Sequence, residues 1–167
     1  MAKIVLSKSR LCGYLLTSMV EWFTQLHFVE HVHNRKELDG LFHDLLKYHW
    51  MDEAQHAKID SLLIDELTRE ISPADREKAI DELLELGGAV DTLLSQQADL
   101  DLQSLERATG RTLRDEEKAE IKQHTQRAYR WTFLVSGLEH PNFVKIVGEL
   151  TAEGQGKLRA AAKSLSN

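Results

Sequence analysis

The sequence lacks the residues and runs on which disulfide-stapled and membrane-spanning proteins depend. Its 167 residues include one cysteine, Cys12, and two prolines. A single cysteine excludes an intramolecular disulfide and a cysteine-rich zinc site, and it fits a reducing compartment. No apolar run reaches the ~18 residues of a membrane span, and residues 1–8 are too short and too charged for a signal peptide. We therefore expect a cytoplasmic protein with no membrane partner.

The chain also has no block of charge of one sign. Its net charge is −6, with acidic and basic residues mixed along the sequence, and a nucleic-acid groove would need a basic face. A glycine-rich phosphate loop, a serine elbow and a cysteine–histidine pairing are missing as well. We expect no nucleic-acid partner, no nucleotide-dependent chemistry and no covalent hydrolysis.

What the sequence does have is helical periodicity. Apolar residues make up 42% of the chain and recur at steps of three and four, with few long β-branched runs. The pattern predicts an all-α protein: a four-helix bundle with two short C-terminal helices, forming one domain over residues 1–167. The core helices are expected at about residues 9–33, 36–69, 73–108 and 113–137, and the short ones at 141–150 and after Thr151.

Glycine and proline mark the expected ends of these helices. Ser72-Pro73 is typical of a helix start, and Thr109-Gly110 of a helix stop. Two adjacent glycines, Gly87-Gly88, cost roughly 2 kcal/mol of helix propensity, so we expect a break there. Ser136-Gly137 is read as a stop. Residues 73–86 are either the start of the third helix or a crossover between the second and third, and the sequence does not decide which.

The second helix has polar groups on the face that should be buried. Its apolar stripe continues through the positions of His49, Glu53 and His56, and six of the eight histidines lie between residues 27 and 56. The stripe is formed by Leu38, Leu41, Phe42, Leu45, Ile59 and Leu63. Unpaired burial of such groups costs several kcal/mol. Glu-x-x-His places two ligands on adjacent turns pointing the same way, so a metal ion is one way to compensate them.

An antiparallel first helix brings Glu21 level with Glu53. Glu21, Glu53 and His56 then form a candidate metal half-site, with His49 as a further ligand or a supporting hydrogen-bond donor. The alternative is a hydrogen-bonded network of His49, Glu53 and His56 without metal, closed by Tyr48 or Glu21. The histidines at 27, 31, 33 and 43 are read as surface or turn residues.

The spacing of Glu21 from Glu53-Ala54-Gln55-His56, and the phrase Trp50-Met51-Asp52-Glu53-Ala54-Gln55-His56, resemble the first half of the ferritin-like di-iron carboxylate proteins. That group includes rubrerythrin, the small subunit of ribonucleotide reductase and the arylamine N-oxygenases. The resemblance implies a ferritin-like bundle that binds iron, two ions in a complete site, with manganese possible. It also implies dioxygen or peroxide chemistry on a small molecule or on iron itself.

The second half of the chain departs from that family pattern. The fourth helix has Glu120 and His124 four residues apart instead of Glu-x-x-His, and the best inward carboxylate of the third helix is Asp91. A complete two-metal site would need Asp91, Glu120 and His124 as substitutes, which a mixed carboxylate–imidazole site permits. Asp81, Glu82, Asp99 and Glu106 are placed on the solvated side.

Two functional hypotheses follow. The first is a metal-dependent oxidoreductase or oxygenase of the ferritin-like class. The second is a non-catalytic helical bundle that binds a protein partner or forms a homodimer. Tyr129, Trp131 and Phe133 alternate too tightly for one helix face, so we expect part of this group to pack under the terminal helices and part to line a pocket or a dimer seam.

Overall fold

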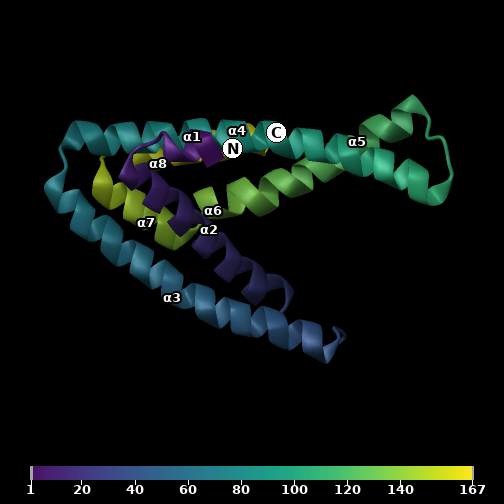
Figure 1. Ribbon diagram of the computed structural model, residues 1–167, viewed down its shortest axis with the longest axis horizontal. Helices are drawn as coiled ribbons and strands as arrows, with labels where there is room; N and C mark the ends of the chain where they lie inside the picture. Colours follow the sequence, from purple (N-terminus) through teal and green to yellow (C-terminus); the bar gives the residue numbers. More distant parts are fainter. Residues whose placement is uncertain (1, 167) are drawn as a thin grey trace.

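The computed structural model describes residues 2–166, and those residues form helices and no strand (Figure 1). The all-α prediction is confirmed; Met1 and Asn167, the ends of the predicted domain, lie outside the described residues. The helices are α1 Ala2–Leu6, α2 Arg10–His31, α3 Gly40–Glu70, α4 Pro73–Thr109, α5 Asp115–Arg130, the π-helix η1 Trp131–Val135, α6 Ser136–Leu138, α7 Pro141–Leu150 and α8 Gly154–Leu165. None of the helices in this part of the chain combines the length and the apolar character that a membrane crossing requires.

The predicted start and stop of the third long helix are confirmed. The Ser72 hydroxyl accepts a hydrogen bond from the Asp75 backbone N–H, and Pro73 occupies the first turn. Gly110 ends the helix with a φ of 64°, the left-handed conformation that favours glycine. Only Ile71 and Ser72 separate the end of α3 from the start of α4, so these helices are joined by a tight turn and not by a crossover.

The predicted break at Gly87-Gly88 is wrong, because α4 runs without interruption from Pro73 to Thr109. Buried side chains lie on both sides of the glycine pair, with Leu83 and Leu86 before it and Ala98 after it. Their packing outweighs the propensity lost at two glycines, as tertiary contacts commonly do.

The long helices form two hairpins that diverge from a common end (Figure 1). In one hairpin α3 packs mainly on α2, and in the other α5 packs mainly on α4, while α2 also contacts α4 near the common end. The α4–α5 pair is tied by Asp91 to Arg130, Asp99 to Lys122 and Glu106 to Lys118. Asp99 and Glu106, predicted to be solvated, therefore serve the helix pairing.

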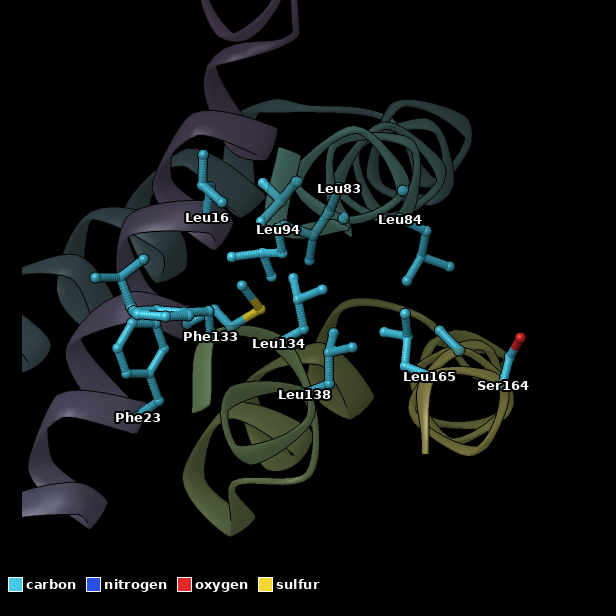
Figure 2. Close-up of a pocket in the computed structure, with 16 residues that line it drawn as sticks. Leu16, Phe23, Leu83, Leu84, Leu94, Phe133, Leu134, Leu138, Ser164 and Leu165 are labelled. Atoms are coloured by element: carbon cyan, nitrogen blue, oxygen red, sulfur yellow. The ribbon is translucent and has the colours of Figure 1, made fainter. Parts of the chain in front are cut away.

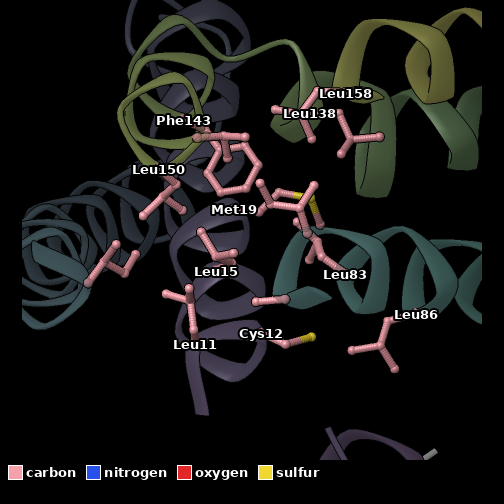
Figure 3. Close-up of a cluster of buried hydrophobic side chains, with 14 of the residues drawn as sticks. Leu11, Cys12, Leu15, Met19, Leu83, Leu86, Leu138, Phe143, Leu150 and Leu158 are labelled. Carbon is pink, nitrogen blue, oxygen red and sulfur yellow. The ribbon is translucent and has the colours of Figure 1, made fainter. Parts of the chain in front are cut away.

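The hydrophobic core fills the common end of the two hairpins (Figure 3). Leu11, Leu15 and Met19 of α2 are buried there. They meet buried side chains of α4, α7 and α8, among them Ile80, Leu83, Phe143, Val147 and Leu158. The short C-terminal helices α7 and α8 thus contribute buried side chains to the core.

The helix ends at Leu138, one residue beyond the stop predicted at Ser136-Gly137. A Cβ atom at Gly137 would come within 2.7 Å of Met19 Cγ. The residue therefore lets α6 approach α2 closely, and the chain continues helically to Leu138.

The apolar stripe of α3 is not buried in its N-terminal half. Leu41 is 81% exposed and Leu45 is 64% exposed. This half of α3 extends beyond the core and packs mainly on α2 (Figure 1). The stripe that the sequence predicted to be buried is therefore exposed at Leu41 and Leu45 in the single chain.

Candidate metal centre

Three side chains of the α2–α3 hairpin converge, as the sequence predicted. Glu21 comes from α2, and Glu53 and His56 come from successive turns of α3; the ligand atoms they offer all lie within 4.8 Å of one another. His56 Nδ1 lies 2.8 Å from Glu53 Oε2 and 4.0 Å from Glu21 Oε1. We call this group the carboxylate–histidine cluster.

Aromatic packing sets the register that brings the cluster together. Phe28 of α2 stacks on Trp50 of α3, with ring centroids 5.0 Å apart. The Gln25 side-chain amide donates a hydrogen bond of 3.0 Å to the Trp50 carbonyl oxygen. Gln25 lies one turn from Glu21 along α2, and Trp50 lies one turn from Glu53 along α3, so this pairing holds the two carboxylates at nearly the same level.

The carboxylates lie deeper than the imidazoles. The side chains of Glu21 and Glu53 are 15% and 16% exposed, whereas those of His49 and His56 are about half exposed. His49 Nδ1 lies 3.1 Å from Glu53 Oε1. Each oxygen of Glu53 therefore meets one histidine, which agrees with a supporting role for His49.

The cluster holds an extra proton because two carboxylates share a half-buried site. Burial, followed by hydrogen bonding to Glu53 and repulsion from its charge, raises the pKa of Glu21 from 4.5 to about 8. The hydrogen bond from Glu21 lowers the pKa of Glu53, and the hydrogen bond to Glu53 raises the pKa of His56. The Glu21 carboxyl is therefore protonated near neutral pH and donates a hydrogen bond to Glu53.

Asp60 is a neighbour of the cluster that sequence reasoning missed. It lies one turn after His56 on α3, is half-buried, and its pKa is raised by burial. Its charge contributes to the raised pKa of Glu21. Its position four residues after His56 was the available signal, since i and i+4 share a helix face.

The predicted second half-site does not assemble with this cluster. Asp91 forms a two-pronged ion pair with Arg130, at 2.6 Å and 2.9 Å. Glu120 and His124 lie on the exposed side of α5, 74% and 61% exposed, and only pair with each other at 3.9 Å. α5 packs mainly on α4, and neither Glu120 nor His124 belongs to the group of ligand atoms that converges with Glu21 and Glu53.

The structure also differs from the sequence-based interpretation at Tyr48, His27 and Glu82. Tyr48 does not close the network: it is exposed, and its ring centroid lies 6.0 Å from Lys47 Nζ. His27 is not a surface residue, because it stacks on Trp131 with centroids 5.2 Å apart and its Nε2 lies 3.2 Å from Ser136 Oγ. Glu82, placed on the solvated side, instead accepts hydrogen bonds from the backbone and the hydroxyl of Ser9, the N-cap of α2.

Comparison with known proteins adds no family assignment. No protein-family model, no curated protein and no solved structure matches the chain. The functional argument therefore rests on the geometry of the carboxylate–histidine cluster.

Proposed function

We propose that the chain binds iron through Glu21, Glu53 and His56 and acts as a metal-dependent oxidoreductase of the ferritin-like kind. The observation that carries this proposal is the convergence of the three ligand atoms within 4.8 Å. Bound iron would supply one-electron oxidation with dioxygen or peroxide, acting on a small organic molecule or on ferrous iron as the substrate. Manganese fits the same ligands.

The residues present fit such an ion. Two carboxylates and one imidazole are a donor set that suits Fe(II) and Mn(II). Glu21 Oε2 is buried and has no hydrogen-bond partner, and a buried oxygen without a partner is costly unless something pairs with it. A divalent ion would replace the proton of Glu21 and bind this carboxylate group.

The chain's own residues have distinct parts in this scheme. Glu21 and Glu53, the more buried of the three side chains, would hold the ion and take or release the proton exchanged on binding, and the more exposed His56 would be the third ligand. His49 orients Glu53 through its other oxygen. His49 and His56 are about half exposed, so the cluster is accessible to solvent in the single chain.

One chain supplies only half of a ferritin-like site, and we propose that a second copy supplies the rest. Leu45 and Ile59 lie exposed on α3 on either side of His49 and His56. Exposed apolar residues around a cluster of ligands are typical of an interface. Two α2–α3 hairpins related by a two-fold axis would make a four-helix bundle with two copies of the ligand set.

The test compares iron content and oligomeric state in matched variants. Wild-type protein and the Glu53→Ala/His56→Ala variant are dialysed against ferrous iron without oxygen. Glu120→Ala/His124→Ala is the control, because it removes the same side-chain types at exposed positions outside the cluster. We expect about one iron per chain in the wild type and the control, and none in the cluster variant. Iron loss in the control, or equal retention in all three, would contradict the assignment.

Leu45→Lys tests the second copy separately. Leu45 is 64% exposed, so the change leaves the single-chain fold intact. We expect wild-type protein to be dimeric by light scattering, and the variant to be monomeric with slower oxidation of ferrous iron on admission of air. A wild-type monomer with full oxidation activity would retain the metal centre and overturn the shared site. Absence of iron from a dimeric wild type would favour the non-catalytic dimerisation module.

A further inference from the structure

An apolar cavity of about 420 Å³ lies between the two hairpins, away from the ligands of the carboxylate–histidine cluster (Figure 2). Its walls come from α2, α4, η1, α6 and α8. Met19, Leu83, Leu134 and Leu138 are its buried lining residues, and Val20 and Phe133 are exposed ones. Among the described residues that line it, Ser164 alone has a polar side chain.

Gly87 and Gly88 enlarge this cavity, although neither packing nor backbone conformation within residues 2–166 requires glycine at these positions. Gly87 and Gly88 both line it, and a Cβ atom at either would meet no other atom within 4 Å. Neither has a positive φ, so the backbone does not require glycine there. Helix propensity favours alanine at both positions. The space beside the two glycines is therefore free of side chains from residues 2–166.

The π-helix η1 aims two further side chains at the same cavity. Its wide turn is closed by a hydrogen bond from the Ser136 backbone N–H to the Trp131 carbonyl oxygen. Phe133 and Leu134, adjacent in sequence, both line the cavity, while Trp131 stacks on His27. Such turns are less stable than α-helix and occur frequently at functional sites. The prediction that part of this aromatic group lines a pocket is confirmed for Phe133.

From these features we propose that the cavity binds a hydrocarbon chain, such as the tail of a fatty acid or a lipid. Its volume lies in the range of ligand sites, which are mostly apolar. No lining side chain carries a charge that could hold a phosphate or a carboxylate inside. Arg130, next to η1, is already paired with Asp91. The lining is mainly leucine, valine and methionine, so it selects for aliphatic character and admits a polar head only at the opening. This inference does not depend on the metal centre.

The experiment follows the fluorescence of cis-parinaric acid, which rises when the probe leaves water. We expect saturable binding of one probe per wild-type chain. Gly87→Leu and Gly88→Leu fill the cavity and should each weaken binding at least ~10-fold, since the methylenes of the ligand lose their place. Both variants should unfold at a higher temperature than wild type, which separates filling from misfolding. Gly156→Leu is the control: this exposed glycine of α8 also has free space and does not line the cavity.

Competition identifies the source of the hydrocarbon. Displacement of the probe by palmitate supports a free fatty acid, and displacement only by phosphatidylcholine vesicles supports a lipid tail. Unsaturable binding, equal binding in the Gly87→Leu and Gly88→Leu variants, or displacement by neither competitor would overturn the proposal. A shift from dimer to monomer in Gly87→Leu, with no probe binding in wild type, would assign the cavity to a second copy of the chain instead.

Discussion

At the scale of single residues, the protonation of Glu21 is the feature with the clearest measurable consequence. A carboxyl group whose pKa is raised to about 8 stabilises the fold fully below its unfolded value of 4.5, and this contribution is lost as the pH rises through 8. Glu21→Gln keeps a hydrogen-bond donor toward Glu53 but cannot ionise. With metal chelated, we expect the variant to gain about 1–3 kcal/mol of unfolding free energy relative to wild type between pH 5 and pH 9. Urea unfolding of both proteins across this pH range measures the difference. If their unfolding free energies changed with pH in parallel, the raised pKa of Glu21 would be refuted.

A second residue-scale prediction concerns Asp91. Its ion pair with Arg130 joins α4 to α5 and is about three-quarters buried. Asp91→Asn should lower the unfolding free energy by about 1–2 kcal/mol, because the largely buried guanidinium of Arg130 loses its charged partner. Iron content should stay at the wild-type level. Urea unfolding and metal analysis of the same preparation measure both, and iron loss would return Asp91 to the list of ligands.

At the scale of elements, glycines in two helices should respond to alanine in opposite directions. Gly137→Ala drives a methyl group against Met19, where a Cβ has only 2.7 Å, and should cost about 1–3 kcal/mol. In Gly87→Ala, the new methyl group on α4 meets no other atom within 4 Å, so the free energy of unfolding should rise by about 0.5–1 kcal/mol. Thermal unfolding of the two variants side by side decides this, and destabilisation by Gly87→Ala would show that α4 needs its glycine for the fold.

At the scale of the whole molecule, metal binding should stabilise the protein through the α2–α3 hairpin. An ion that binds only the folded state at a hundred times its dissociation constant adds about 2.7 kcal/mol, or roughly 5–10 °C in the unfolding midpoint for a chain of this size. Mn(II) avoids oxidation and serves as the probe. We expect the shift in wild type and its absence in Glu53→Ala/His56→Ala. If two copies share the site, the midpoint should also rise with protein concentration, and a midpoint independent of concentration would argue for a single-chain site.

The sequence by itself determined the long helices, apart from the break predicted at Gly87-Gly88, and the convergence of Glu21, Glu53 and His56. Periodicity, the Ser72-Pro73 cap and the Gly110 stop are local signals, so they survive any tertiary arrangement. Glu21, Glu53 and His56 follow from spacing along two helices joined by a short turn, and that geometry needs no other part of the chain. The tertiary structure alone decided the rest. Helical periodicity does not determine which helices pack together. Asp91 was therefore a candidate metal ligand from the sequence, whereas in the structure it pairs with Arg130. The same limit explains why the stripe of α3 was predicted to be buried: periodicity shows that a face is apolar, and only packing decides what covers it.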